Sequence, residues 1–353
     1  TIKSTVPLLE VHGRAITDVF YEKLFFSHPC LKNIFNMANQ GKGEQSRALS
    51  DAVLAYAKHI DQVEVLLPVV QRIAHKHVSL GIQAKHYSIV GENLLAAIQD
   101  VLSLSDDHPA LAAWAEAYEV LANIFIQVEE DIYQSNQQQA GGWKGYRDFY
   151  IDRIVVETPD VKSFYFKPMD LEEVSSGNGG QYIGVRVRPN GCGHYQIRQY
   201  SLSQKGCLRI SVKSEGVVSN YLHNCQEGDA VSLQSPTGVF TLGDRQSKHI
   251  FIAGGVGITP LMSMIQEAID QSVAAENILL VQCAKDEEFA MAVKSGQSLP
   301  NSGLPTPAFT PSAPNNSAMN LGTAYPGYSN QPNTPYFPGA KPDTADMMPY
   351  PPM

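Results

Sequence analysis

The sequence predicts a multidomain protein in which an all-helical domain precedes a small antiparallel β-barrel and a short α/β unit. In the first part of the chain, apolar residues recur three and four apart, which is typical of amphipathic helices. Short alternating segments of β-branched and aromatic residues follow, separated by Gly and Pro, and these favour strands. A strand, a glycine-rich turn and a helix come next, and a low-complexity tail ends the sequence.

Length and composition exclude several classes of function. The chain has 353 residues, enough for two or three domains with buried cores. Its net charge is -9 and no block of basic residues occurs, which argues against nucleic acid or an anionic membrane as partner. No apolar run approaches the roughly 20 residues of a membrane helix, and no signal-peptide pattern is visible. The 5 cysteines form no CxxC pair, so we expect free thiols in a cytoplasmic protein.

Changes in pattern along the chain place the domain boundaries. Residues 1–138 are predicted to form about six to eight helices, and a glycine-containing linker follows them. The β-barrel is placed at 146–245 and the α/β nucleotide-binding unit at 248–291. Residues 292–353 are rich in Pro, Ser, Asn and Gly. Such a segment buries too little apolar surface to offset its ordering entropy, so we predict that it is disordered.

A histidine on an apolar helix face is the first candidate site. Leu66, Val70, Ile73 and His77 follow one another at helical spacing, so His77 is expected to face the domain core. A second helix presents the polar Gln45 among apolar residues, and Tyr21 lies on the apolar face of a third. Two interpretations of His77 are open at this point: a hydrogen-bonded core histidine, or an axial ligand of iron in an apolar haem pocket.

Several strings in this region resemble the globin domain of bacterial and fungal flavohaemoglobins. They are Phe35-Asn36-Met37, Ala74-His75-Lys76-His77, His86-Tyr87-Ser88-Ile89-Val90-Gly91-Glu92 and Ala140-Gly141-Gly142-Trp143. The resemblance implies that haem b is bound with His77 as the proximal iron ligand. It also implies proximal hydrogen-bonding roles for Tyr87 and Glu129 and distal roles for Tyr21 and Gln45. Without the resemblance, Glu129 would be interpreted as part of a solvated acidic helix face.

A second candidate site lies in the predicted barrel. Arg198-Gln199-Tyr200-Ser201 combines a guanidinium that can grip a diphosphate with an aromatic ring and a hydroxyl that suit a flavin. The alternative is an ordinary strand with one exposed arginine. A resemblance to the ferredoxin-reductase-like FAD domain, the second module of flavohaemoglobins, implies FAD contacts at the following residues: Tyr182, Arg198, Gln199, Tyr200, Ser201 and Ser219. Ser219 is expected to cap a helix whose N-terminus suits the diphosphate.

A glycine-rich turn after the last predicted barrel residue is the third candidate. It resembles the nicotinamide-nucleotide loop of the same family, which implies contacts at Gly255, Val256, Gly257, Ile258, Thr259 and Pro260. The family's further strands and its Cys-Gly-Pro turn are not found in this sequence. The strands and helix that are present are therefore expected to expose apolar faces, and NAD(P)H binding is in doubt.

The combined resemblance implies a nitric oxide dioxygenase, an oxidoreductase that converts NO and O2 to nitrate. Electrons would pass from NAD(P)H through FAD to haem. The alternative is a non-enzymatic globin that binds O2 or NO beside a vestigial reductase. A third hypothesis is a flavin reductase that does not need the haem. In each case the ligands are small molecules, and no nucleic acid, membrane or protein partner is implied.

Overall fold

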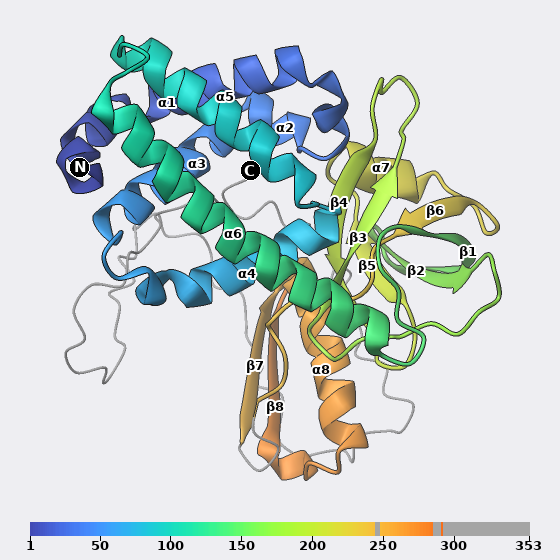
Figure 1. The fold of residues 1–353 in the computed structure, drawn as a ribbon. Coiled ribbons are helices and arrows are strands. Elements are labelled where there is room, and N and C mark those ends of the chain that lie inside the picture. The colour runs from blue at the N-terminus through green and yellow to red at the C-terminus, as the bar shows by residue number, and fades with distance from the viewer. Residues whose placement is uncertain (244–247, 285–290, 292–353) are drawn as a thin grey trace, which may run out of the picture. The chain divides into compact units, whose positions relative to one another are not determined.

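The computed structural model describes residues 1–243, 248–284 and 291. The tail predicted to be disordered, 292–353, lies outside these described residues. The described part has an N-terminal helical bundle, an antiparallel barrel-like sheet and a small α/β unit, so the predicted fold class is confirmed (Figure 1).

The N-terminal domain is a bundle of helices, and all of them except the short second helix bury an apolar face. The helices are α1 (Val6–Ser27), α2 (Met37–Gly41), α3 (Glu44–Lys58), α4 (Leu67–Leu80), α5 (Lys85–Leu102) and α6 (Pro109–Gln138), with 3-10 turns at Ile2–Thr5, Pro29–Asn33 and Val63–Leu66. Gly81 ends α4 in the left-handed region, and Pro109 begins α6 behind the cap of His108. In the described part of the chain, no helix is both long and apolar enough to cross a bilayer.

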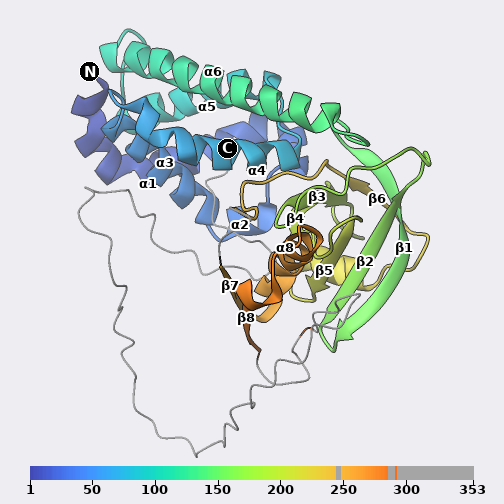
Figure 2. The same ribbon diagram turned by 90° about the horizontal axis from the view of Figure 1, so that it is seen from below.

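The second domain is a six-stranded antiparallel sheet that curves towards a barrel. Its strands are β1 (Arg147–Thr158), β2 (Val161–Pro168), β3 (Tyr182–Val187), β4 (Gln196–Ser201), β5 (Arg209–Lys213) and β6 (Ala230–Leu233), in the order β4-β3-β6-β1-β2-β5. Figure 2 shows the long, curved pair β1 and β2. A bridge between Leu202 and Ile210 brings the two edge strands together, and short helix α7 (Val217–His223) follows β5.

The core of this domain is formed by alternate residues of the strands, as the pleat requires. Phe149, Ile151, Phe164 and Ile210 are fully enclosed. Trp143, from the linker after α6, packs against Phe149 at the edge of this core. The strands therefore show the predicted alternation of core-facing side chains. Strand β4, which carries the flavin-type motif, is part of this packed sheet.

The third part is one strand–helix–strand unit. Strands β7 (His249–Gly254) and β8 (Ile278–Cys283) pair in parallel, and α8 (Thr259–Asp270) connects them, with 3-10 turns at Gly255–Ile258 and Ala275–Asn277. The inner side chains of β7 are buried with α8. The outer side chains of both strands are apolar and exposed: Ile250, Ile252, Leu279 and Val281. The expectation that this unit exposes an apolar face is confirmed.

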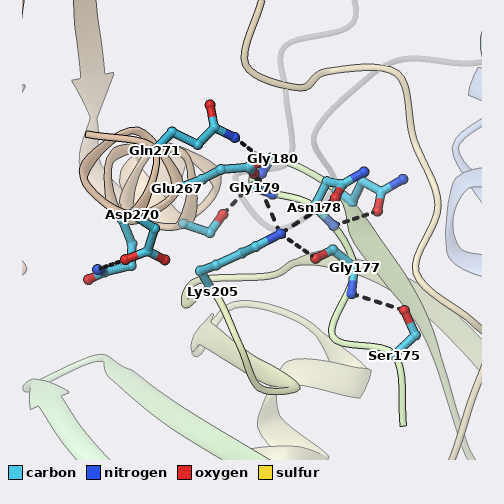
Figure 3. Close-up of polar contacts among 12 residues, drawn as sticks. Ser175, Gly177, Asn178, Gly179, Gly180, Lys205, Glu267, Asp270 and Gln271 are labelled. Atoms are coloured by element: carbon cyan, nitrogen blue, oxygen red, sulfur yellow. Dashed lines mark hydrogen bonds and ion pairs between the residues drawn. The ribbon is translucent and has the colours of Figure 1, made fainter. Parts of the chain in front are cut away.

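Helix α8 is held by the loop that leads into β3 (Figure 3). Ser263 accepts a hydrogen bond from the backbone N–H of Gly180, and Glu267 accepts one from that of Gly179. Lys205 donates to the carbonyl of Gly177 at 2.9 Å and lies 3.8 Å from Glu267. Gly180 has φ +90, and a Cβ there would lie 2.0 Å from the carbonyl oxygen of Phe240. Only glycine therefore fits this position.

Candidate functional site: a buried histidine and a flavin-type strand

Helix α4 places His77 in the core of the bundle. Leu66, Val70, Ile73 and His77 are all buried, and the His77 side chain is 2% exposed. The predicted apolar face is confirmed. Gly81, with φ +76, donates its N–H to the carbonyl of Val78 and ends the helix one turn after His77. The imidazole is therefore fixed near the end of a regular helix.

Two buried side chains hold the imidazole from one side. Glu129 Oε1 lies 2.6 Å from His77 Nδ1 and accepts a hydrogen bond from the Tyr87 hydroxyl, also at 2.6 Å. Burial, together with the charge of Glu129, raises the pKa of Tyr87, so the phenol keeps its proton and donates it. Because a carboxylate only accepts hydrogen bonds, His77 Nδ1 carries a proton in this arrangement. The predicted partners of His77 are thus brought together from α5 and α6.

The other imidazole nitrogen suits a metal ion. His77 Nε2 is fully buried and has no hydrogen-bond partner among the described residues. A buried nitrogen without a partner is costly in a protein core. With Nδ1 protonated, the lone pair of Nε2 is available for coordination. A metal-bound histidine typically donates its other N–H to a carboxylate, which is the geometry found here, so these residues fit an axial ligand of haem iron.

Aromatic packing completes the surroundings of His77. The Phe125 ring lies 5.5 Å from the imidazole and stacks on the Tyr87 ring at 6.3 Å. Tyr87 in turn lines a small cavity of about 10 Å³ that reaches Phe35. A cavity of this size is about that of one water molecule, so the side chains around His77 are closely packed.

The residues predicted for the distal side, Tyr21 and Gln45, come from α1 and α3. Tyr21 is buried, stacks on Phe25 at 5.8 Å and meets the Phe35 ring edge-on at 5.9 Å. Gln45 is also buried, and its Oε1 has no hydrogen-bond partner within the described ranges. Thr17, one turn before Tyr21, donates to the carbonyl of Ser46, so α1 and α3 pack at this level.

Strand β4 divides the flavin-type motif between two faces. Arg198 and Tyr200 alternate with Gln199 and Ser201 along the strand, so the pairs point to opposite sides. Tyr200 is buried, and Arg198 donates to the carbonyl of Ile197 at 2.8 Å. Tyr182 on β3 lies directly opposite Ser201 in the antiparallel register. The structure therefore brings Tyr182, Arg198, Tyr200 and Ser201 onto two neighbouring strands.

Gln199 contacts the helix that carries His77. Its amide nitrogen donates to the hydroxyl of Ser79 at 3.0 Å, and its amide oxygen accepts from Lys76. Close backbone packing supports this contact, because a Cβ added at Gly184 would lie 1.9 Å from the carbonyl oxygen of Ser79. Lys76 is therefore not simply a solvated helix lysine. Sequence analysis missed that Gln199 links β4 to α4; the two-residue period of the strand was the available signal.

Ser219 does not cap α7 from the N-cap position. The N-cap is Gly216, and Ser219 is the third helical residue. Its hydroxyl accepts from the N–H groups of Glu215 and Gly216 at 3.0 and 2.8 Å. The expectation of a serine cap is therefore wrong in position, because the chain enters the helix three residues earlier. Ser219 still fixes the loop that leads into α7.

The glycine-rich turn has the form expected of a phosphate-binding loop. The side chains of Val256, Ile258 and Thr259 are buried and anchor the turn. A Cβ added at Gly255 or Gly257 would meet nothing within 4 Å, so the glycine backbone borders open space. Thr259 and Pro260 then begin α8. This turn can offer backbone N–H groups to an anion, whereas its buried side chains cannot reach one.

Comparison with known proteins supports both halves of this site. The globin family model matches residues 18–125, and the oxidoreductase FAD-binding domain matches residues 149–242. The chain is 47% identical over 292 residues to the flavohemoprotein of Halalkalibacterium halodurans, covering 79% of this chain and 71% of that protein. The chain belongs to the flavohaemoprotein family.

Two further flavohaemoproteins extend the comparison. The flavohemoprotein of Bacillus subtilis is 45% identical over 293 residues, which cover 82% of this chain and 73% of that protein. The crystal structure of flavohemoglobin from Malassezia yamatoensis with bound FAD and heme matches with a TM-score of 0.74 and 27% identity. That match covers 82% of this chain and 77% of the solved chain.

Proposed function

We propose that this flavohaemoprotein is a nitric oxide dioxygenase, an oxidoreductase that converts NO and O2 to nitrate with electrons from NAD(P)H. The observation that best supports the proposal is the buried His77, whose Nε2 has no partner among the described residues while Nδ1 faces Glu129. When bound, haem b and FAD supply the redox chemistry. The heme and FAD bound by the Malassezia relative support assigning both cofactors to this chain.

In this proposal the proximal residues set the ligand strength of His77. Glu129 accepts a hydrogen bond from the Nδ1–H of His77 and makes the imidazole a stronger electron donor through Nε2. Tyr87 donates to the same carboxylate oxygen and keeps it in place. Phe125 packs on both rings and excludes water from the group. A strongly donating ligand favours the activation of bound O2 over its simple storage.

The distal residues would orient the small ligands. Burial raises the pKa of Tyr21 well above its ordinary value, so its hydroxyl stays protonated and able to donate. Gln45 supplies an amide from α3. Phe35 and Leu49 are buried apolar residues of the same domain, and they are proposed to line the distal side. Tyr21 and Gln45 are therefore the proposed donors to O2 or to NO-derived groups.

The barrel residues would hold FAD. Arg198 is the proposed partner of the diphosphate, since a guanidinium can bind two phosphate oxygens at once. Tyr200 is proposed to contact the ring system from one side of β4, and Ser201 and Tyr182 from the other side, where β4 ends and β3 begins. Ser219 fixes the entry to α7. Gln199 stays part of the proposed site, and its role there is to form hydrogen bonds with Lys76 and Ser79 on α4. The backbone of the 255–260 turn is the proposed contact for NAD(P)H.

The protein is proposed to act in the cytoplasm on freely diffusing O2 and NO. Support comes from the 5 cysteines, all of which are free thiols and lie at Cys30, Cys192, Cys207, Cys225 and Cys283. Free thiols persist in a reducing compartment. No nucleic acid, membrane or protein partner is part of the proposal.

Anaerobic absorption spectra of the protein loaded with haem and FAD test the proposal. Addition of NADH is expected to shift the Soret band to that of reduced haem, and added NO in air is expected to be consumed over many turnovers. His77→Ala should lose the Soret band while the flavin spectrum remains. Consumption of a single equivalent of NO would instead favour a gas-binding globin. Unchanged NADH oxidation in His77→Ala, without NO consumption by the parent protein, would favour a flavin reductase.

A further inference from the structure

Two asparagines of the globin domain accept hydrogen bonds from the segment that carries the flavin-type motif. Asn33 Oδ1 accepts a hydrogen bond from the backbone N–H of Tyr195 at 2.8 Å. Asn36 Oδ1 accepts one from Nη2 of Arg198 at 2.7 Å. Both pairs are separated by 162 residues in the chain. One short segment before α2 is thus bonded to the beginning of β4.

The side-chain oxygen of Asn36 accepts hydrogen bonds both from helix α2 and from Arg198. Its Oδ1 accepts from the backbone N–H groups of Ala38 and Asn39 at 3.1 and 3.3 Å, which caps α2. Because α2 is tied to this oxygen, the oxygen that meets Arg198 has a fixed position. A second acceptor, the carbonyl of Ile197, lies 2.8 Å from Nη1 of the same guanidinium. The guanidinium of Arg198 is therefore held by Asn36 of the globin domain and by the carbonyl of Ile197 on its own strand.

We propose that Asn36 is a positioning residue for FAD, which orients Arg198 for the FAD diphosphate from outside the FAD-binding domain. This inference rests on the proposed function, in which Arg198 grips that diphosphate. A guanidinium carries five N–H donors, so it can be anchored by carbonyl oxygens and contact phosphate at the same time. An arginine that is held in place before binding loses less side-chain entropy when the ligand arrives. Asn36 thereby contributes to FAD affinity without touching FAD.

The same segment also faces the haem side. Phe35, next to Asn36, is buried and packs edge-on against Tyr21 and Phe25, at 5.9 and 5.4 Å between ring centres. Neighbouring residues in an extended stretch point to opposite sides, and Asn36 is extended at φ -75 and ψ 93. The segment can therefore pack on the haem pocket through Phe35 and on the flavin strand through Asn36.

FAD binding to the haem-loaded, flavin-free full chain tests this inference, with quenching of flavin fluorescence as the readout. Asn36→Ser keeps an N-cap oxygen, but the side chain is too short to meet Arg198. It is expected to weaken FAD binding about tenfold, with haem content and thermal midpoint unchanged. Asn36→Asp also keeps the cap, but its carboxylate competes with the diphosphate for Arg198, so it should weaken binding at least as much. Asn93→Ser, on α5 and bonded to Ser27 and Ile89 of the same domain, is the matched control.

A double-mutant cycle separates positioning from a structural role. If Asn36 acts through Arg198, Asn36→Ser should have no further effect on FAD binding in an Arg198→Ala background. Equal FAD affinity in the parent protein, Asn36→Ser and Asn36→Asp would overturn the inference and leave the proposed function standing. An equally large loss in the Arg198→Ala background would also overturn it. If the parent protein itself binds no FAD, the proposed function and this inference both fail.

Discussion

The carboxylate of Glu129 lies 2.6 Å from Nδ1 of His77, and both side chains are almost fully enclosed. This pair connects the longest helix of the globin domain with the helix that carries the proposed iron ligand. Because His77 Nε2 has no partner within the described part of the chain, the pair leaves one nitrogen suited to coordination. The electronic character of that nitrogen therefore depends on Glu129.

Glu129→Gln tests this dependence. The amide keeps the size of the side chain but carries no negative charge, so the imidazole becomes a weaker electron donor. We expect haem to be retained, the haem reduction potential to rise and NO consumption to fall about 10- to 100-fold. Spectroelectrochemical titration measures the potential. Tyr87→Phe leaves the Glu129–His77 contact intact and should give a smaller shift in the same direction. An unchanged potential in Glu129→Gln would show that the carboxylate does not tune the ligand.

A buried ion pair in the barrel predicts a stability effect. Arg209 donates to Glu157 at 2.6 Å and to Ser163 at 2.9 Å, with the Arg209 and Glu157 side chains 7% and 3% exposed. Arg209→Met leaves a buried carboxylate without its cation, which should lower the free energy of unfolding by about 3–5 kcal/mol. Denaturant titration followed by Trp143 fluorescence, in a Trp114→Phe background, reports on this domain.

The control for that prediction is an exposed ion pair. Lys167 on β2 and Asp152 on β1 are 59% and 33% exposed, and Lys167→Met should lower the free energy of unfolding far less than Arg209→Met does. The double variant Arg209→Met with Glu157→Gln removes both charges and should recover part of the loss. Equal effects of Arg209→Met and Lys167→Met would contradict the role given to the buried pair.

Gly184→Ala is expected to disturb the contact between β3 and α4. The added Cβ would lie 1.9 Å from the Ser79 carbonyl oxygen, and a helix backbone cannot rotate that oxygen away. Haem and FAD should still bind, but electron transfer between them should slow by about 10- to 100-fold, as expected when reacting groups shift by about 1 Å. Stopped-flow absorbance measures haem reduction after flavin reduction. Gly193→Ala, where a Cβ meets nothing within 4 Å, should leave the rate unchanged.

The rate at which the Cys225 thiol is alkylated is predicted to depend on pH. Burial, followed by the charge of Asp229, raises the pKa of Cys225 from 9.0 to about 11. Only the thiolate is alkylated, so below pH 9 Cys225 should react about 100-fold more slowly than a thiol with its ordinary pKa. Its rate should keep rising up to pH 11, as read by mass spectrometry with the exposed Cys30 for comparison. By linkage, the stability contribution of the protonated thiol is present below pH 9 and is lost as pH rises through 11. A rate that levels off near pH 9 would contradict the shift.

Some of this architecture follows directly from local patterns. The helical period of Leu66, Val70, Ile73 and His77 is undisturbed, so the buried face of α4 could be predicted. The partners of His77 could not be predicted in the same way. Tyr87 and Glu129 lie 10 and 52 residues further along the chain, and their contact with His77 depends on how α5 and α6 pack on α4. The acidic residues around Glu129 indicate a solvated helix face, so only the resemblance to a known family predicted a role for Glu129 beside His77.

For the flavin-type motif, the local sequence pattern was sufficient to predict which residues face opposite sides. Its four residues were all expected at one ligand, although the two-residue period of a strand already predicts that Arg198 and Gln199 face opposite sides. Asn36 also has a local signal, since an asparagine before a short helix is a typical N-cap. Its bond to Arg198 has no local signal, because tertiary packing brings the two residues together.

The outer face of β7 and β8 has a practical consequence for handling this protein. Ile250, Ile252, Leu279 and Val281 form a block of branched side chains that are 41–72% exposed. Kosmotropic salts such as ammonium sulfate strengthen the association of apolar surface. The chain should therefore salt out earlier than its net charge of -9 suggests. It should also bind a dye such as ANS in its native state, and both properties should fade when Ile252 and Leu279 are replaced by threonine.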